Sequence, residues 1–532
     1  MSTGVAVETE RVPVLIVGAG LAGLASAVFL ARRGIRVLLV ERHSGTSLFP
    51  RAVGQNQRTM ELLGFGGVAG DVPTVGPDAA KFRVRVAGSL RGPAFREEVS
   101  DPDTGDRGVL SPAGLGTAGQ HELEPLLRRH AETLGATLRF DTELISFDQD
   151  DDGITAVLRD RERVSRVRAD YLVAADGNRS SVREALGVDR HGPGSLGHNI
   201  SIIFDADLAD LIDPAQPTLH VLHTAHTAGV FVTVDHTRDR HLLTVDYDPA
   251  TQSLAEFTTD RCRELIRSIT EAPDLHPRIQ AVRPWEMAAA IADRFRVGRV
   301  LLAGDAAKVT PPSGGFGGNT AIGDAYDLAW KLAAVLDTTA GPALLDTYDT
   351  ERRPIADRVV AEVLRLLAAR GPDTTTDTGP VSDRQRALEL TLGFRYRSTA
   401  VCIDDTDPAD SEDPYHPTGR PGFRAPHLWL HHNGEKQSTI DLFGHGFVLL
   451  TGPDNHAWAT AAATTTARLG TTITTHTIHT EPALTEFRTR YGLTTTGATL
   501  IRPDGIIAWR TPGTPDNPTR TLHDTLTTIL AR

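Results

Sequence analysis

The pattern that most constrains the fold lies within the first 41 residues. An apolar run at residues 12–17 is followed by GAGLAG at residues 18–23, a helical pattern, and a second apolar run that ends at Glu41. In a strand–helix–strand unit, the three glycines allow a tight turn, close approach of a pyrophosphate, and close packing of helix on strand. The helix N-terminus offers N–H groups to phosphate oxygens, and Glu41 is placed to bind ribose hydroxyls. The pattern predicts a dinucleotide-binding unit, with an ordinary glycine-rich turn as the alternative.

A second glycine-rich run, at residues 299–333, indicates another ligand-binding loop. It reads as a buried strand, the turn Gly304-Asp305, the loop PPSGGFGGN and a helix. Glycine lets the backbone approach a ligand without an intervening Cβ. Asp305 can accept a hydrogen bond from a sugar or sugar-alcohol hydroxyl, and the helix N-terminus can direct N–H groups at an electron-rich ligand edge. A strand–turn–helix pattern at Asp176-Gly177 has the same form, although such turns are also common without a ligand.

In their order and spacing, these three segments resemble the FAD-dependent class A aromatic hydroxylases. The resemblance extends through residue 400 and includes PRAVGQNQRTMELL, where Arg51 matches an arginine near the FAD, and Gln120, which matches a flavin-site glutamine. The segments GDAAKVTPP, FRYRSTAV, GRPGFRAPH and RPDGIIAWR resemble the narrower group of polyketide hydroxylases of anthracycline biosynthesis. Lys308 stands where most of the wider family has histidine, and the narrower group also carries lysine.

The resemblance implies a flavin monooxygenase that hydroxylates a polycyclic aromatic polyketide. FAD would be reduced by NADPH or NADH and would react with O₂ to give a flavin C4a-hydroperoxide, which attacks an electron-rich ring carbon. Baeyer–Villiger insertion or quinone-forming oxidation by the same cofactor is the alternative, and a flavin-binding protein without turnover is a remote one. The residues expected at the cofactor are Gly18, Ala19, Gly20, Leu21, Ala22, Gly23, Glu41, Arg42, Arg51, Gln120, Leu144, Asp176, Gly177, Gly304, Asp305, Pro312, Gly315, Gly317, Gly318 and Asn319.

The residue that activates the substrate is less well marked. A base or cation near the substrate phenol would raise the nucleophilicity of the ring. The family resemblance places Arg370 in this role, with a solvated cation at a helix end as the alternative. His220 and His223 flank the position of a substrate-sheet tyrosine in the narrower group, where this chain has Val221. Either histidine is a candidate base, although histidines on a sheet are more often packed or solvated.

The domain organisation is predicted to be discontinuous, and the fold class is α/β. We expect a Rossmann-like FAD-binding domain formed by residues 1–75, 111–185 and 291–400, and an inserted β-sheet substrate domain formed by residues 76–110 and 186–290. Residues 405–532 resemble the thioredoxin-like appendage of larger family members and would be redox-silent, because they contain no CxxC motif. The threonine-rich tract near residue 465 is predicted to form a helix and then a strand, in which threonine is common.

Composition excludes several other functions. The net charge of −13 and the lack of a basic stripe argue against nucleic acid as a partner. No apolar run approaches the length of a membrane span, and the polar N-terminus is not a secretory signal. The two distant cysteines favour a reducing cytoplasm. His476 and His479 would face opposite sides of an alternating strand, so we expect no metal site there or elsewhere. We expect the protein to be either a monomer or a homodimer.

Overall fold

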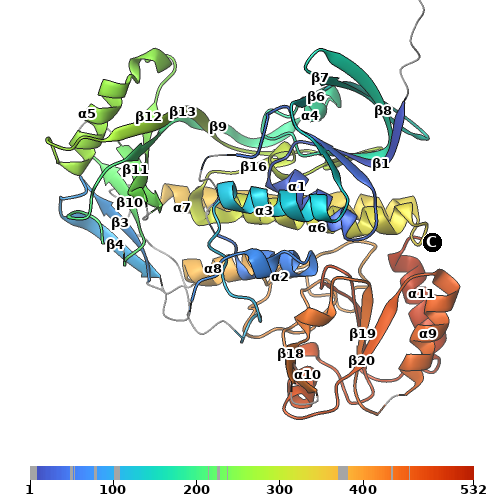
Figure 1. Cartoon of the computed structure of the whole chain (residues 1–532). Coiled ribbons are helices and arrows are strands. Elements are labelled where there is room, and N and C mark those ends of the chain that lie inside the picture. The colour runs from blue at the N-terminus through green and yellow to red at the C-terminus, as the bar shows by residue number, and fades with distance from the viewer. Residues whose placement is uncertain are drawn as a thin grey trace, which may run out of the picture.

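The computed structural model describes residues 9–47, 49, 52, 54–76, 81–100, 108–213, 215–224, 228–235, 238–369, 381–432, 435–454 and 456–532. Two eight-stranded sheets lie side by side above a smaller C-terminal unit (Figure 1). Within the described ranges, no helix is long and apolar enough to cross a membrane, and no group of side chains is suited to hold a metal ion.

The first sheet carries the N-terminal glycine-rich loop. Its central strands pair in parallel, with Ile16 opposite Leu39 on one side and Val173 on the other. These strands are apolar and buried, as expected of a parallel sheet covered on both faces. The sheet consists of β1 (Glu10–Val17), β2 (Val37–Val40), β5 (Thr137–Arg139), β6 (Thr142–Asp150), β7 (Gly153–Asp160), β8 (Arg163–Ala174), β14 (Arg296–Val297) and β15 (Val300–Leu302).

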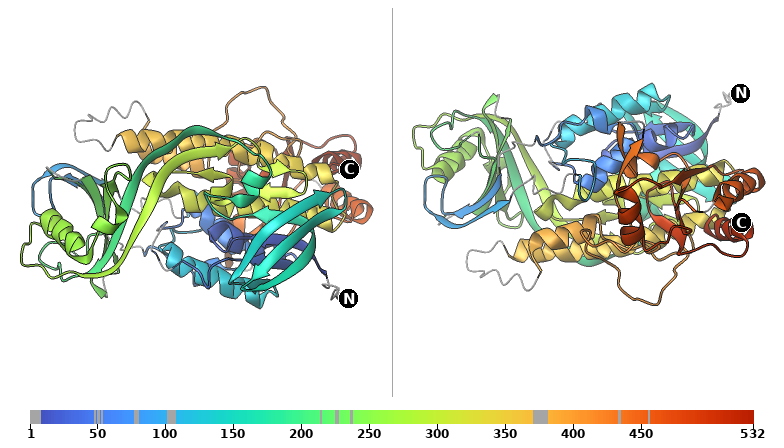
Figure 2. Two further views of the ribbon diagram at one scale, coloured as in Figure 1. Left: turned by 90° about the horizontal axis from the view of Figure 1, so that it is seen from above. Right: turned by 90° about the horizontal axis from the view of Figure 1, so that it is seen from below.

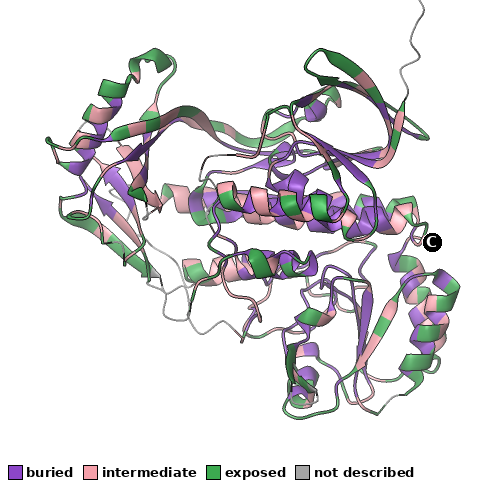
Figure 3. Cartoon of the chain, viewed as in Figure 1, coloured by how far each residue is buried: buried purple, intermediate pink, exposed green. Residues whose placement is uncertain are grey.

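Helices that begin at both glycine-rich loops pack together beside this sheet. The helix α1 (Leu21–Ala31) contacts both α3 (Gln120–Thr133) and α6 (Phe316–Leu336). Burial is concentrated in α1, in α6 and in the central strands, whereas α3 is largely half-buried or exposed (Figure 3). The remaining helices outside the C-terminal unit are α2 (Gln57–Phe65), α4 (Ser181–Ala185), α5 (Thr259–Thr270), α7 (Asp346–Ala368) and α8 (Asp383–Thr391).

Two long strands join the second sheet to the first sheet and the helices packed on it, which together we call the first unit. Figure 2 shows β9 and β13 running from one unit into the other. The strands of this sheet are β3 (Phe82–Ala87), β4 (Ala94–Ser100), β9 (Arg190–Asp205), β10 (Thr218–His223), β11 (Ala228–Asp235), β12 (Arg240–Tyr247), β13 (Arg278–Ala292) and β16 (Lys308–Val309). The strand β16 belongs to the second glycine-rich loop, so this loop is built into the edge of the sheet.

The two faces of the second sheet have different neighbours. The amphipathic helix α5 covers one face, where Leu265 and Ile269 share a core with Phe231. The opposite face is turned toward the first unit. From that face Arg283 lies over the Phe49 ring, 5.4 Å from its centroid, and Arg96 Nη1 donates to the Ala369 carbonyl at 3.0 Å. A ligand between the two units would therefore contact the face opposite α5.

The C-terminal unit has a thioredoxin-like arrangement. Its four-stranded sheet has the order β20-β19-β21-β22, in which β19 and β20 are parallel and the other pairs are antiparallel. The threonine-rich tract forms α9 and then β20, as the sequence predicts. The elements are β17 (Trp429–His432), β18 (Glu435–Ser438), β19 (Phe447–Thr451), α9 (Ala457–Leu469), β20 (Ile473–Thr477), α10 (Ala483–Tyr491), β21 (Ala498–Ile501), β22 (Ile507–Thr511) and α11 (Pro518–Ile529).

The C-terminal unit shares a hydrophobic core with the helix α6. Trp330 of α6 lies in one buried cluster with Phe447, Trp458 and Leu526 of the C-terminal unit. The indole of Trp330 meets the ring of Phe447 edge-on, with 6.3 Å between centroids. The C-terminal unit is thus packed against the helix that follows the second glycine-rich loop.

Candidate active site

At two of the three glycine positions in the loop after β1, there is no space for a residue larger than glycine. Gly18 has a φ of +103°, and a Cβ there would lie 2.3 Å from the Ala175 carbonyl oxygen. A Cβ on Gly23 would lie 1.9 Å from the carbonyl oxygen of Gly18. Gly20 differs, because the nearest protein atom to its Cβ position is Glu124 Oε1 at 3.9 Å. The loop is therefore closed toward the protein and open at Gly20, where a ligand can approach.

Glu41 holds this loop from the end of β2. Its Oε2 accepts a hydrogen bond from the Ala19 N–H at 2.8 Å, and its Oε1 accepts from the His43 N–H at 2.9 Å. The N-cap residue of the helix α1 is Gly20, which has no side chain to cap the helix, so the first N–H groups of α1 are available to an anion. Leu21 and Ala22 are buried in the first turn, and the Arg42 side chain is exposed beside the loop.

The start of α3 closes the other side of Gly20. Gln120 Nε2 donates to Glu124 Oε1 at 2.6 Å, and the buried Glu124 also accepts from the Ser47 N–H at 2.7 Å. Sequence reasoning named Gln120 but missed Glu124, although the spacing of four residues places the two on one helix face. Leu144 lies on β6 opposite Leu158 of β7 and packs against the core of this unit.

The second glycine-rich loop lies directly against the first. A Cβ on Gly304 would lie 2.8 Å from the Ala22 Cβ, and a Cβ on Gly318 would lie 3.0 Å from Leu21 Cδ1. The N-cap residue of the helix α6 is Gly315, which has a φ of +67° and no capping side chain. The starts of α1 and α6 are thus brought together at one place, as a ligand that bridges both loops requires.

Asn319 fixes the first turn of α6. Its Oδ1 accepts from the Asn56 N–H at 2.9 Å, and its Nδ2 donates to the Gly315 carbonyl at 2.8 Å. Gly317 is half-buried, with Thr310 Oγ1 3.3 Å from its Cβ position. Asp305 and Pro312 have exposed side chains in this loop. The loop therefore presents backbone groups and the Asp305 carboxylate at its surface.

The third segment is arranged as a helix cap. The Asp176 carboxylate accepts from Ser180 Oγ at 2.5 Å and from the Val182 N–H at 3.1 Å, at the start of α4. Gly177 has a φ of +84° in the turn. These contacts belong to the strand-to-helix turn itself, so a cofactor role for Asp176 and Gly177 stays a prediction. Arg51 and Arg370, both expected at the site, lie outside the described residues.

The structure separates the two candidate histidines. His220 lies opposite Phe231 on the face covered by α5, with 5.7 Å between ring centroids. Burial, together with the charges of Arg85 and Arg83, lowers the pKa of His220 to about 4. His223 lies on the opposite face, which is turned toward the first unit, and its buried Nε2 has no hydrogen-bond partner within the described structure. Of the two, His223 alone is placed to meet a ligand between the units.

A carboxylate accompanies His223 on that face. The strand register places Ala228 opposite His223, and Asp246 beside Ala228 on the next strand. Desolvation raises the pKa of the Asp246 carboxyl, and the nearby His223 opposes this shift. Ala228 is small, so the two longer side chains can lean toward each other across it.

The buried carboxylate of Asp324, in the helix α6, was not recognised from the sequence as part of the site. Asp324 and Lys308 form a buried ion pair behind the second glycine-rich loop, and Asp324 Oδ2 also accepts from the Gly304 N–H at 3.2 Å. Burial is the main cause that lowers the pKa of Lys308. The sequence could have indicated Asp324, because it is an acidic residue within a largely apolar helical pattern, and such a residue is rarely buried without a partner.

The arrangement fits FAD. The two uncapped helix starts suit the pyrophosphate and the electron-rich edge of the flavin ring, and Glu41 lies at the strand end where a ribose is bound in dinucleotide folds. Comparison with known protein families agrees, because a FAD binding domain matches residues 11–363. The C-terminal domain of aromatic-ring hydroxylases matches residues 418–532.

Several characterised proteins resemble the chain over its length. Aklavinone 12-hydroxylase RdmE of Streptomyces purpurascens is 46% identical over 539 residues, covering 98% of this chain and 99% of the relative. Tetracenomycin A2 monooxygenase-dioxygenase of Streptomyces glaucescens is 41% identical over 557 residues, covering 99% of this chain and 98% of the relative. A crystal structure of aklavinone-11 hydroxylase with FAD and aklavinone superposes with a TM-score of 0.91 at 46% identity, over 99% of this chain and 100% of that one. The chain belongs to the FAD-dependent aromatic-ring hydroxylases.

Proposed function

We propose that this monooxygenase holds FAD across its two glycine-rich loops. The pyrophosphate would lie at the start of α1 beside Gly20, and the ribose hydroxyls at Glu41. The flavin ring would lie at the loop from Gly304 to Asn319. The observation that carries the proposal is the direct contact of the two loops, because it brings two uncapped helix N-termini together.

The substrate we propose is a polycyclic aromatic polyketide bound between the flavin loop and the second sheet. The names of the relatives support this class, since aklavinone and tetracenomycin are such compounds. The sheet face opposite α5 is suited to a flat apolar ligand, because its register brings Val221, Val230 and Thr244 onto one surface. At its rim, Trp285 Nε1 donates to Ser201 Oγ at 3.0 Å.

His223 is the residue that we propose as the base for the substrate phenol. Neutral imidazole with an unpartnered Nε2 can accept a phenolic proton, and the carboxylate of Asp246 would stabilise the resulting imidazolium. Bound FAD would supply the redox chemistry, taking electrons from NADPH or NADH and delivering one oxygen atom of O₂ to the ring. Enclosure of the substrate between the sheet and the first unit would exclude water during this step. A cytoplasmic setting, inferred from the two free cysteines, is part of the proposal.

Turnover with defined substrates tests the reaction. Purified holoenzyme is supplied with NADPH, O₂ and a panel of tetracyclic aglycones, and the products are examined by mass spectrometry and NMR. We expect NADPH oxidation coupled to a product that is heavier by one oxygen and keeps its ring connectivity. A ring-expanded lactone would indicate Baeyer–Villiger insertion, and a quinone would indicate quinone-forming oxidation. FAD binding without any turnover on the panel would contradict the proposal.

Two histidine variants test the base. His223→Ala should lower kcat by about 100-fold at neutral pH and recover at a pH where the substrate phenol ionises by itself. His220→Leu is the matched control on the same strand, and we expect its kcat to change less than about twofold, because His220 packs against Phe231 on the other face. Equal effects of the two substitutions would remove His223 from the role.

A further inference from the structure

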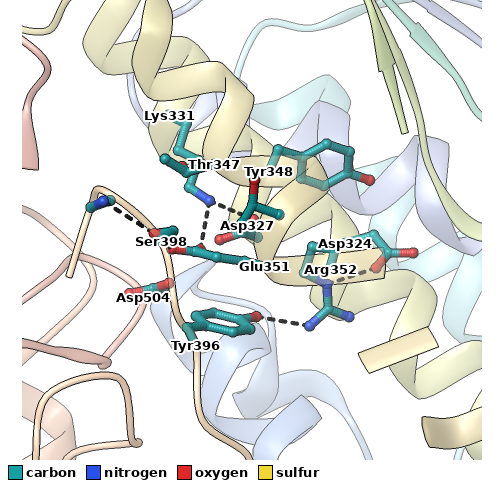
Figure 4. A network of polar contacts seen from close by, with 12 residues as sticks. Asp324, Asp327, Lys331, Thr347, Tyr348, Glu351, Arg352, Tyr396, Ser398 and Asp504 are labelled. Carbon is teal, nitrogen blue, oxygen red and sulfur yellow. Dashed lines mark hydrogen bonds and ion pairs between the residues drawn. The ribbon is translucent and has the colours of Figure 1, made fainter. Parts of the chain in front are cut away.

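A buried ionic cluster connects the second glycine-rich loop with the C-terminal unit. Figure 4 shows most of its members between α6, α7 and the segment around residue 396. Its side chains are almost completely buried and comprise four basic and four acidic residues. We call the core ion cluster the set Lys308, Lys331, Arg352, Arg502, Asp324, Asp327, Glu351 and Asp504.

One end of the core ion cluster holds the flavin loop. Asp324 accepts from the Gly304 N–H, contacts Lys308, and accepts from Arg352 Nε at 2.8 Å. Arg352 Nη2 also donates to the Thr320 carbonyl at 3.2 Å, near the start of α6. A movement of Arg352 would therefore reach both the Gly304 turn and the start of α6.

The other end belongs to the C-terminal unit. Arg502 lies in the turn between β21 and β22 and is fully buried. Its Nη1 and Nη2 donate to the two oxygens of Glu351 at 2.6 and 2.9 Å, and its Nε donates to Asp504 Oδ1 at 3.1 Å. This bidentate contact is the direct link between the C-terminal unit and α7 within the cluster.

The helix α7 joins the two ends. Glu351, which binds Arg502, and Arg352, which binds Asp324, are neighbours in the chain. The segment between the units reinforces both, because Ser398 Oγ donates to Glu351 Oε1 at 2.5 Å and Arg352 Nη1 donates to Tyr396 OH at 2.9 Å (Figure 4). Charges that are buried this deeply tolerate little displacement, since each depends on its partners to offset the loss of hydration.

We propose that Arg502 is a positioning residue for the flavin, acting through Glu351 and Arg352 of α7 on the loop that holds the flavin ring. The C-terminal unit, which has no CxxC pair, would then contribute to catalysis by fixing the place and the charge environment of that loop. The inference rests on the proposed placement of the flavin ring at Gly304–Asn319.

The reduction potential of bound FAD measures this role. Arg502→Met removes one cation and leaves the carboxylates of Glu351 and Asp504 in excess. Reduced flavin carries more negative charge than oxidised flavin. The affinity of the protein for reduced flavin should therefore fall about tenfold more than its affinity for oxidised flavin, which lowers the two-electron potential by about 30 mV. The affinity of the apoprotein for oxidised FAD, measured by fluorescence titration, separates a change of potential from simple loss of cofactor.

Three further variants make the measurement specific. Arg502→Lys keeps the charge but loses the bidentate fork, so it should restore part of the potential. Ser398→Ala removes one hydrogen bond to Glu351 without removing a charge, and should shift the potential in the same direction by a smaller amount. Arg510→Met is the control in the C-terminal unit, because Arg510 pairs with Asp404 and donates to the Thr418 carbonyl outside the core ion cluster.

The possible results decide the proposal. A lowered potential in Arg502→Met, partial recovery in Arg502→Lys and no change in Arg510→Met would support it. An unchanged potential in Arg502→Met with FAD bound would overturn it, and so would equal shifts in Arg510→Met. If Arg502→Met does not fold, an unchanged potential in Ser398→Ala overturns the proposal and a lowered one supports it. Failure of the wild-type protein to bind FAD would instead contradict the proposed function.

Discussion

The glycine-rich loop after β1 and the one after β15 both lead into an uncapped helix, but different forces hold them. The first is fixed by close backbone contacts among neighbouring segments, including those of Gly18 with Ala175 and of Gly23 with Gly18. The second is fixed by buried charges, above all Asp324 of α6, which contacts Lys308 of β16 and Arg352 of α7. The first loop should therefore be the more sensitive of the two to added volume, and the second the more sensitive to lost charge.

Loss of charge behind the second loop should have the largest effect. Lys308→Met leaves Asp324 with one cation fewer in a buried site, and breaking a buried ion pair costs about 3–5 kcal/mol. We expect this decrease in the free energy of unfolding in urea titrations of the holoenzyme, together with weaker FAD retention. Lys436→Met is the control, because Lys436 is exposed and should change stability by less than about 1 kcal/mol. Equal effects of both substitutions would contradict the charge-based account of this loop.

Added volume in the first loop should have the next largest effect. Gly23→Ala places a Cβ 1.9 Å from a backbone oxygen, and overpacking of this kind costs about 3 kcal/mol. The apoprotein itself should therefore melt at a lower temperature, measured by calorimetry. A native-like melting temperature for the apoprotein would show that the loop has more freedom than its contacts indicate.

A methyl group at the open glycine should affect the ligand and spare the fold. Gly20→Ala meets no protein atom closer than 3.9 Å, so the apoprotein should keep its stability within about 0.5 kcal/mol. The affinity for FAD should fall about tenfold, because the backbone can no longer approach the pyrophosphate closely. Titration of FAD into both apoproteins separates Gly20→Ala from Gly23→Ala, and an unchanged FAD affinity would move the pyrophosphate away from Gly20.

Exposed charges should contribute least. His191 on β9 contacts Asp293 and Asp357 at 2.7 and 2.9 Å, and these carboxylates raise its pKa above the usual value of 6.5. A raised pKa in the folded state gives stability that is complete below pH 6.5 and is lost as pH rises through the folded pKa. Because the groups are half-exposed, the loss should be below about 1 kcal/mol. The melting-temperature difference between wild type and His191→Gln should shrink from pH 6 to pH 9, and a constant difference would contradict this.

The comparison of the two loops also explains what the sequence could predict. The first loop and Glu41 belong to one strand–helix–strand unit within the first 41 residues, and Glu41 contacts Ala19 as its spacing suggests. The threonine-rich tract was likewise predicted to form a helix and then a strand with alternating threonines, and these are α9 and β20. Local spacing and periodicity carry this information because the forces involved act between near neighbours in the sequence.

Features that depend on distant segments could not be predicted in the same way. His220 and His223 were equal candidates, since the sequence does not say which face of β10 meets α5. Arg502 gave no signal, because its partner Glu351 lies 151 residues away in the chain. Buried charge networks are determined by tertiary packing, and a sequence shows only that a charged residue stands in an apolar context.

Isotope labelling tests the central claim, that this chain uses FAD to transfer one atom of O₂ to an aromatic polyketide. The holoenzyme is supplied with NADPH, an aklavinone-type aglycone and ¹⁸O₂ in ordinary water, and the product is analysed by mass spectrometry. We expect one heavy oxygen on a ring carbon of the product, and no label when the heavy isotope is supplied as water. A product that takes its oxygen from water, or oxidation of the aglycone without any label, would contradict the account.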